Sequence, residues 1–290
     1  MAVVVITGCS TGIGFAIAKT LAREGHRVYA TMRSPEKSPD LLQLSDKEKL
    51  SLQVLIMDVN NGVSVQRAFD QVILREGQID VLVNNAGIGI VGAVEDVSLD
   101  LHRSCMETNY FGTVRCIKAV LPLMRERQIG TIINISSVAG KFWSPFHGAY
   151  CATKAAVEAL SESLAQEVLP FHIRVALVEP GVIETPIFLK GNEIPVDSHY
   201  PNIRRLNAFF AASLENHVQP DTVATVVRDI ISGKADKFRH PSGPDAAPIL
   251  KWRASVSDEE WVNDYPSDDE TWIKNQEKYL HLNVRPFMQT

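Results

Sequence analysis

A glycine-rich turn between a buried strand and a helix constrains the fold of this chain more than any other feature. Residues 2–6 form a short apolar, β-branched run, which is typical of a strand buried on both faces. Residues 7–14 follow with glycines at positions 8, 12 and 14, and residues 15–23 have the periodicity of an amphipathic helix. Backbone N–H groups and the helix dipole then converge on an anion. A tight turn that only needs glycine is the alternative, but the placement favours dinucleotide binding.

The remaining apolar runs predict a doubly wound parallel sheet. They lie near residues 27–32, 52–58, 80–84, 131–136 and 173–179 and alternate with helical segments, which is the pattern of an α/β fold. Residues 34–50, with two prolines, indicate a surface excursion. We expect one domain over residues 1–243, followed by an extension over residues 244–290 that is rich in Pro, Trp and acidic residues.

Tyr150 and Lys154 form a candidate reactive pair. On a helix, a four-residue step places both side chains on one face, one turn apart. An ammonium group beside a phenol stabilises the phenolate, lowers the pKa of the phenol and allows proton exchange near neutral pH. A solvated helix edge is the ordinary alternative for such a pair.

Composition and charge narrow the class of protein. A net charge of −5 over 290 residues gives no general attraction to nucleic acid or to an anionic membrane. No apolar run approaches the roughly 20 residues of a membrane helix, and the early first strand leaves no room for a cleaved leader. The four cysteines lack metal-site spacing, so we expect free thiols, no metal and a cytoplasmic location.

The chain carries five motifs in order: the glycine-rich turn from Thr7 to Gly14, the run from Asn84 to Gly87, then Asn109, Ser137, and Tyr150 with Lys154. Together they resemble the short-chain dehydrogenase/reductase family in its single-domain form, over about residues 2–185. The chain is most similar to the 17β-hydroxysteroid and retinol dehydrogenase branch, on residues 28–33 and 150–154. The resemblance implies a Rossmann-type, three-layer α/β/α fold with about seven strands, the last near residues 237–239. It also implies a homodimer or homotetramer formed through the helices that bear Asn109 and Tyr150. The matching residues are Thr7, Gly8, Gly12, Ile13, Gly14, Asn84, Asn85, Ala86, Gly87, Asn109, Ser137, Tyr150 and Lys154.

The resemblance also implies catalytic roles. Asn109 corresponds to the residue whose backbone holds a water in a proton relay, and Ser137 to the hydroxyl that holds the substrate carbonyl. Tyr150 corresponds to the proton donor and Lys154 to the residue that lowers its pKa. Without the resemblance, Asn109 is a locally bonded polar residue and Ser137 a loop hydroxyl.

The residues at the end of the second predicted strand indicate the cofactor preference. An NAD site usually has an acidic residue there, whereas this chain has Met32 followed by Arg33, which can pair with a 2′-phosphate. We therefore favour NADP(H), with NAD(H) possible; an exposed arginine before a loop is the alternative. The family pattern gives the cofactor-binding set Gly8, Thr11, Gly12, Ile13, Gly14, Arg33, Asp58, Val59, Asn85, Ala86, Gly87, Tyr150, Lys154, Pro180, Gly181 and Thr185.

The substrate region is expected near residues 186–218, where the family places its lid. Apolar and aromatic side chains there and in residues 142–146 favour a bulky lipophilic carbonyl or alcohol, such as a steroid, retinoid or aryl ketone. Several of these side chains could instead pack helices, and His147 could be a surface residue. The candidate substrate-binding residues are Ser137, Phe142, Trp143, His147 and Phe188.

Three functional hypotheses remain at this point. The first is a ketone reductase or alcohol dehydrogenase that acts on a lipophilic substrate. The second is a β-ketoacyl carrier-protein reductase. Its partner, the carrier protein, is acidic and requires a basic surface around the cleft, which the acidic composition of this chain does not indicate. The third is a dinucleotide-binding sensor without chemistry, which the complete set of catalytic motif residues disfavours. For the extension, the alternatives are closing the cleft, forming a subunit contact or covering the body of the domain.

Overall fold

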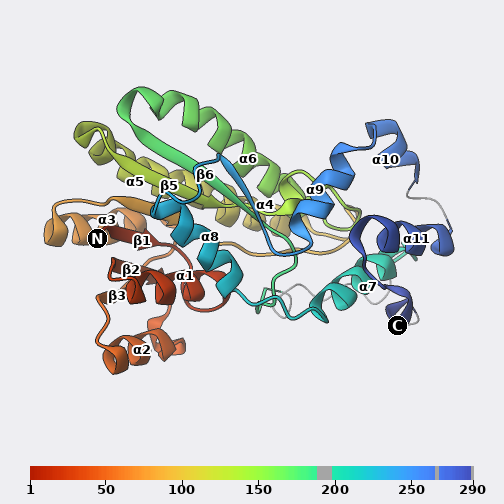
Figure 1. The fold of residues 1–290 in the computed structure, drawn as a ribbon, viewed down its shortest axis with the longest axis horizontal. Coiled ribbons are helices and arrows are strands. Elements are labelled where there is room, and N and C mark those ends of the chain that lie inside the picture. The colour runs from red at the N-terminus through yellow and green to blue at the C-terminus, as the bar shows by residue number, and fades with distance from the viewer. Residues whose placement is uncertain (188–197, 265–267, 289–290) are drawn as a thin grey trace.

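A single parallel sheet of seven strands forms the centre of the computed structural model, which describes residues 1–187, 198–264 and 268–288 (Figure 1). The strand order is β3-β2-β1-β4-β5-β6-β7. Neighbouring strands pair in parallel throughout, as a doubly wound fold requires. The strands are β1 Val3–Ile6, β2 Arg27–Met32, β3 Leu52–Ile56, β4 Val81–Asn84, β5 Gly130–Ile135, β6 Ile173–Pro180 and β7 Arg239–Ser242.

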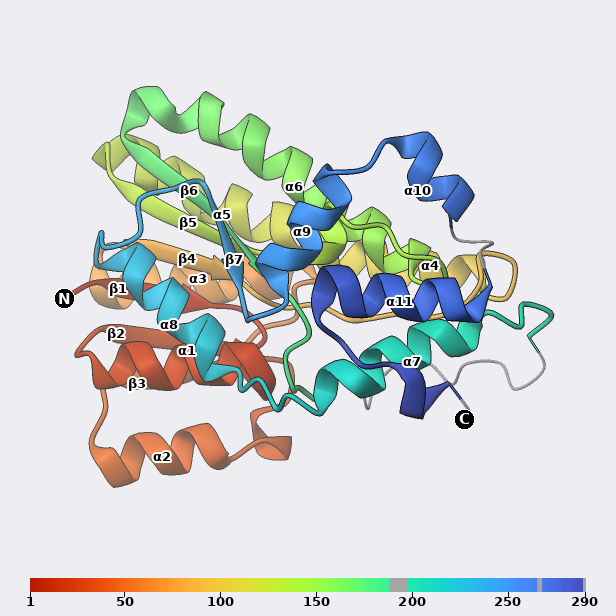
Figure 2. The ribbon, with the colours of Figure 1, turned by 45° about the vertical axis from the view of Figure 1, so that its right-hand side comes forward.

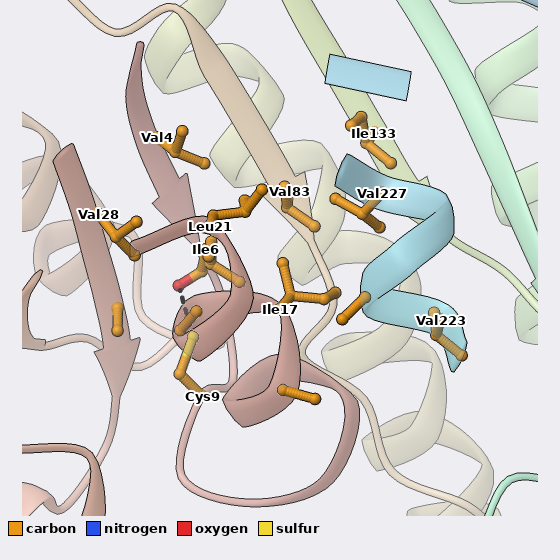
Figure 3. Close-up of a cluster of buried hydrophobic side chains, with 14 of the residues drawn as sticks. Val4, Ile6, Cys9, Ile17, Leu21, Val28, Val83, Ile133, Val223 and Val227 are labelled. Carbon is orange, nitrogen blue, oxygen red and sulfur yellow. Dashed lines mark hydrogen bonds between the residues drawn. The ribbon is translucent and has the colours of Figure 1, made fainter. Parts of the chain in front are cut away.

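Helices cover both faces of the sheet, because successive side chains of each strand point to opposite faces. Val4 and Ile6 of β1 pack against α1 and α8 in one buried cluster (Figure 3). Val3 and Val5 belong to the cluster on the opposite face, with α3, α5 and α6. The apolar run of β1 is therefore buried on both sides, as predicted from its sequence.

The helices connect the strands and form the two outer layers (Figure 2). None of the helices among the described residues is long and apolar enough to cross a membrane. The α-helices are α1 Gly12–Arg23, α2 Asp40–Glu48, α3 Gly62–Glu76, α4 Leu99–Met106, α5 Gly112–Arg127, α6 Gly148–Val168, α7 Ile203–Leu214, α8 Asp221–Ile231, α9 Ala246–Ala254, α10 Asp258–Asp264 and α11 Asp269–Leu280. The shorter turns are η1 Pro35–Lys37, η2 Glu107–Phe111, η3 Val138–Gly140, η4 Leu169–Phe171 and η5 Arg285–Phe287, of which η2 is a π-helix.

The predicted fold class and its strands are confirmed. The seventh strand lies at Arg239–Ser242, two residues later than the predicted position. The segment 34–50 holds the short helix α2, whose Leu41 is fully buried, so only part of it is a surface excursion.

The C-terminal extension packs onto the domain through aromatic and aliphatic side chains. Trp272 and Ile273 of α11 join Ala208 and Ala212 of α7 in one buried cluster, and the two helices lie side by side (Figure 2). Trp252 of α9 stacks on a tyrosine of α11 with ring centroids 4.8 Å apart. The described part of the extension therefore packs next to α7.

Candidate active site

A cleft of about 640 Å³ opens at the carboxyl ends of the central strands. It is lined by the turns that follow the first six strands, β1 to β6, and by α6, α7 and α9. Parallel sheets bind their ligands at this edge, beside the point where the strand order reverses. Between β1 and β4 the order of this sheet reverses in that way.

The glycine-rich turn is tied to the turn after β4. The Thr7 hydroxyl accepts hydrogen bonds from the backbone N–H groups of Asn85 and Ala86, both at 2.9 Å. The Asn85 amide donates to the carbonyls of Thr7 (2.9 Å) and Gly8 (3.1 Å). A Cβ atom at Gly14 would overlap that amide and the Gly8 carbonyl, so glycine is needed there for close packing.

The start of α1 faces the cleft with its backbone donors available. The helix begins at Gly12, and both Gly12 and Ile13 line the cleft. Thr11, in the N-cap position, makes no side-chain capping hydrogen bond. The first N–H groups of α1 are thus suited to an anionic group such as a phosphate.

Nearly all of the predicted cofactor residues come together in this cleft. Gly14 is the exception, because it packs below the turn rather than facing the opening. The lining members of the predicted set are Gly8, Thr11, Gly12, Ile13, Arg33, Asp58, Val59, Asn85, Ala86, Gly87, Tyr150, Lys154, Pro180, Gly181 and Thr185.

The end of β2 presents a cationic side chain to the cleft. Met32 is buried, whereas Arg33 is exposed and lines the opening. Within the described parts of the chain, the Arg33 guanidinium has no hydrogen bond or ion pair. It is therefore available to an anionic group of a ligand.

Helix α6 and the end of β5 bring Tyr150, Lys154 and Ser137 to one wall of the cleft. The Lys154 ammonium donates to the Ile135 carbonyl at 2.8 Å and lies 5.6 Å from the centroid of the Tyr150 ring. The Ser137 hydroxyl donates to the Pro180 carbonyl at 3.4 Å and accepts from the N–H of Ala139 at 3.1 Å. The serine and the tyrosine thus come from different elements, the turn after β5 and the helix α6.

Burial controls the protonation of the pair. It raises the pKa of Tyr150 above its ordinary value, and the nearby Ser137 hydroxyl offsets only part of this effect. Burial lowers the pKa of Lys154 to about 8. The net pKa of Tyr150 is thus raised and not lowered as expected from a neighbouring ammonium, because desolvation of the phenolate is the largest cause of the shift. Tyr150 is a protonated phenol at neutral pH.

Asn109 does not line the cleft. It lies in the π-helix η2 and is buried, with 2% of its surface exposed. Its Oδ1 accepts from the Ile88 N–H at 2.9 Å, and its Nδ2 donates to the Ile88 carbonyl (3.0 Å) and to Thr153 Oγ1 (2.9 Å). The side chain ties the loop that follows β4 to the helix that carries Tyr150.

The end of the cleft beyond Tyr150 is mainly apolar. Phe142 and His147 line it, as predicted, together with residues of α7. Trp143 does not reach it: this side chain is half exposed, and its ring packs against the Arg253 guanidinium at 5.9 Å, outside the cleft. Phe188 lies outside the described residues. The apolar lining consists of Ile88, Val91, Phe142, Ile187, Leu206, Phe209, Phe210, Leu214 and Ile249.

His147 is stacked on the tyrosine. The two rings are 4.7 Å apart and almost parallel, at 15°, and Phe210 meets the imidazole edge-on at 5.6 Å. Burial lowers the pKa of His147 to about 4, so the ring is neutral at pH 7. A neutral imidazole retains one donor and one acceptor nitrogen.

Two residues that support the site were missed from the sequence. Thr153 accepts from Asn109 while it donates to the Tyr150 carbonyl at 2.8 Å. Asp245, which precedes α9, is half-buried and accepts from the Val182 N–H at 2.8 Å, next to Gly181. No local pattern marks Asp245, because its partner lies 63 positions earlier in the chain.

The four cysteines are free and buried, as predicted for thiols that serve packing. Burial raises the pKa of Cys105 and Cys151 to about 11 and that of Cys116 to about 12, and it raises the pKa of Cys9 further. These thiols remain protonated, and therefore poor nucleophiles, at neutral pH.

Comparison with known proteins agrees with this geometry. Residues 2–193 match the family model described as short chain dehydrogenase. A 3-ketodihydrosphingosine reductase from Bacteroides thetaiotaomicron is 38% identical over 250 residues, which cover 83% of this chain and 88% of the relative. Retinol dehydrogenase 8 from Bos taurus is 36% identical over 266 residues, covering 87% and 84%. The predicted resemblance to the retinol branch is thus confirmed.

A solved structure supports the nature of the cofactor. An alcohol dehydrogenase from Thermococcus sibiricus, complexed with 5-hydroxy-NADP, is 28% identical and superposes with a TM-score of 0.69. The match covers 83% of this chain and 94% of that one. A nicotinamide dinucleotide is therefore the class of cofactor that the cleft is built to hold.

Proposed function

Because this chain belongs to the short-chain dehydrogenase family, we propose that it is an NADP(H)-dependent oxidoreductase that interconverts a lipophilic ketone and its secondary alcohol. The observation that carries the proposal is the convergence of Ser137, Tyr150 and Lys154 on one wall of a cleft whose other end is apolar.

Residues along the cleft fit an NADP(H) molecule. The uncapped start of α1 would hold the pyrophosphate, and Arg33 would pair with a 2′-phosphate. Asp58 would accept from the adenine amino group, and Thr185 would hold the carboxamide. When bound, the nicotinamide supplies or accepts the hydride.

The protein residues handle the proton and the orientation of the substrate. In reduction, Ser137 donates a hydrogen bond to the substrate oxygen while Tyr150, a protonated phenol at pH 7, transfers its proton to that oxygen. The phenolate left behind is stabilised by the Lys154 ammonium, which the Ile135 carbonyl holds in place. Asn109 keeps α6 in position through Thr153.

The apolar end of the cleft supports a bulky lipophilic substrate. Its walls are aliphatic and aromatic side chains from α7, α9 and the loop before α6. Two relatives named for a 3-ketodihydrosphingosine and for retinol agree with this choice. His147 would contact the substrate beside the reacting carbon. We further propose a homodimer or homotetramer in the cytoplasm.

Replacement of the proton donor tests the reaction. Tyr150→Phe is expected to bind NADPH normally and to reduce a lipophilic ketone at least ~100-fold more slowly. NADPH consumption is measured by absorbance with a panel of substrates that contains steroid, retinoid, aryl and acyl-thioester carbonyls. Tyr200→Phe, whose hydroxyl bonds to Glu95 outside the cleft, is the matched control with near-normal turnover. Near-normal turnover by Tyr150→Phe would refute the assignment.

Replacement of the cationic side chain tests the cofactor preference. Arg33→Ala is expected to raise KM for NADPH by ~10- to 100-fold, since a charge-assisted hydrogen bond is worth about 1.5–3 kcal/mol. KM for NADH should change less than about twofold, because NADH lacks the 2′-phosphate that would pair with Arg33. Equal changes for the two cofactors would contradict the preference.

A further inference from the structure

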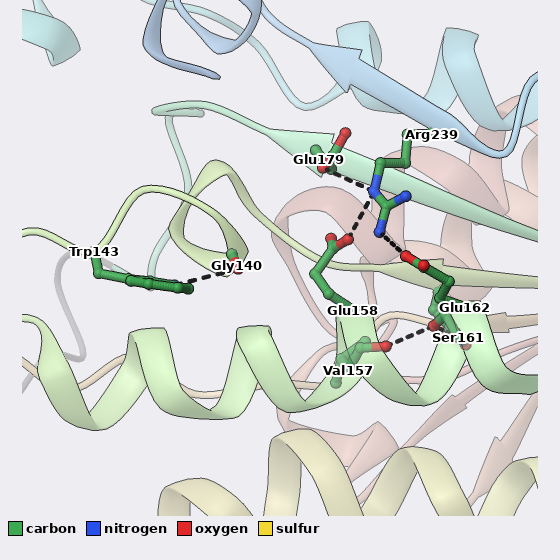
Figure 4. A network of polar contacts seen from close by, with 9 residues as sticks. Gly140, Trp143, Val157, Glu158, Ser161, Glu162, Glu179 and Arg239 are labelled. Atoms are coloured by element: carbon green, nitrogen blue, oxygen red, sulfur yellow. Dashed lines mark hydrogen bonds and ion pairs between the residues drawn. The ribbon is translucent and has the colours of Figure 1, made fainter. Parts of the chain in front are cut away.

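A partly buried ion-pair network joins α6, β6 and β7 (Figure 4). Glu158 of α6 and Glu179 of β6 are almost completely buried, at 2% and 1% exposure. Both face Arg239 of β7, whose Nε lies 3.1 Å from Glu158 Oε2 and 3.8 Å from Glu179 Oε1. Arg239 also donates to the exposed Glu162 at 2.8 Å. Two buried carboxyl groups therefore share one guanidinium.

The two buried carboxyl groups compete, and Glu179 is the weaker partner of Arg239. Its contact with Arg239 is longer, and burial together with the negative charge of Glu158 raises the pKa of Glu179 to about 7. Arg239 and Lys141 act in the opposite direction. Glu179 is therefore the carboxyl group that takes up a proton as the pH falls through about 7, and the shorter contact pairs the Glu158 carboxylate with the guanidinium.

Glu158 is one helical turn from Lys154 on α6, so the two side chains share a face of the helix. Glu158 Oε1 is buried and has no hydrogen-bond partner among the described residues. Arg239 thus engages one oxygen of the carboxylate and leaves the other free of hydrogen bonds.

Lys154 needs a negative charge nearby to remain an ammonium. It is 6% exposed, and burial disfavours its charged form. Glu158 and Cys105 act against that effect. Cys105, with a pKa of about 11, is a neutral thiol over the whole physiological range, so Glu158 is the described residue that brings a negative charge to Lys154.

We propose that the Glu158 carboxylate is a positioning residue for catalysis that keeps Lys154 protonated over the working pH range. This inference rests on the role proposed above for Lys154. The sign follows from charge: loss of the carboxylate destabilises the ammonium, so Lys154 loses its proton at a lower pH. The rate of ketone reduction, which needs the ammonium, then falls at a lower pH as well.

The test is the pH profile of kcat for ketone reduction in wild type, Glu158→Gln, Glu158→Asp and Glu162→Gln. Wild-type activity is expected to fall as the pH rises through about 8. Glu158→Gln should move this midpoint down by about one pH unit, which is a ~10-fold loss of rate on the alkaline side. Glu158→Asp retains the charge, and Glu162→Gln removes an exposed carboxylate from the same arginine, so both should keep the wild-type midpoint.

Glu158→Gln leaves Arg239 with Glu162 and Glu179 as partners, which protects the fold. If this variant is unstable, Glu158→Met provides a second neutral side chain of similar length. A uniform loss of kcat with an unchanged midpoint would overturn the inference, as would an equal shift in Glu162→Gln. Failure of the proposed function can be distinguished from failure of this inference. It would appear as normal turnover by Tyr150→Phe, whatever the midpoints of the pH profiles of the Glu158 and Glu162 variants.

Discussion

Asn109→Ala is expected to lower the free energy of unfolding by about 2–4 kcal/mol. The wild-type amide, 2% exposed, bonds to both backbone groups of Ile88 and to Thr153 Oγ1 at 2.9–3.0 Å. A buried group left without its partner costs about 1–3 kcal/mol. The substitution removes these three bonds and a weaker one to the Cys105 sulfur at 3.4 Å. The Thr153 hydroxyl keeps its bond to the Tyr150 carbonyl, which lowers the total cost. Turnover should fall too, because Ile88 lines the cleft.

Urea unfolding followed by circular dichroism gives the free energy, with Asn216→Ala as the control. Asn216 is exposed, and its substitution should change stability by less than about 0.5 kcal/mol. If Asn109→Ala loses turnover but less than about 1 kcal/mol of stability, the side chain acts in the chemistry and the reasoning from its buried bonds is refuted.

Two further predictions concern the cofactor loop and the thiols. Gly181→Ala should raise KM for NADPH by ~10-fold or more, because a Cβ there would overlap the Asp245 carboxylate that bonds to the N–H of Val182. Gly62→Ala is the control, since the space around Gly62 is open. Equal changes of KM in the two variants would contradict the argument. Iodoacetamide at pH 8 should label the cysteines of the native protein far more slowly than those of the urea-unfolded protein, since burial raises the thiol pKa values. The labelling rates are measured by mass spectrometry, and equal rates in the two states would contradict this prediction.

Local patterns were sufficient for the fold and for much of the cleft. The run of residues 2–6, the glycines that follow and the helix after them are adjacent in the chain, so their periodicity and turn chemistry show directly in the sequence. Parallel strands place their carboxyl ends at one edge, and this rule brings residues as distant as Arg33, Tyr150 and Thr185 to the same cleft.

The contact partners of individual side chains could not be predicted from local sequence patterns. Trp143 was expected on the substrate wall, yet it packs on Arg253 of the extension, 110 positions later in sequence numbering. Asn109 was assigned from its motif, but its bonds to Ile88 and Thr153 depend on how η2 meets α6.

The sequence by itself determined the alternation of strands and helices, the glycine-rich turn after the first strand and the placement of Tyr150 and Lys154 on one helix, because each is encoded in neighbouring residues. Only the tertiary structure decided that burial raises the pKa of Tyr150 and lowers that of Lys154, and that Glu158 and Glu179 meet Arg239. Desolvation and ion pairing depend on what the folded chain places around a group, and those neighbours come from strands and helices far apart along the chain.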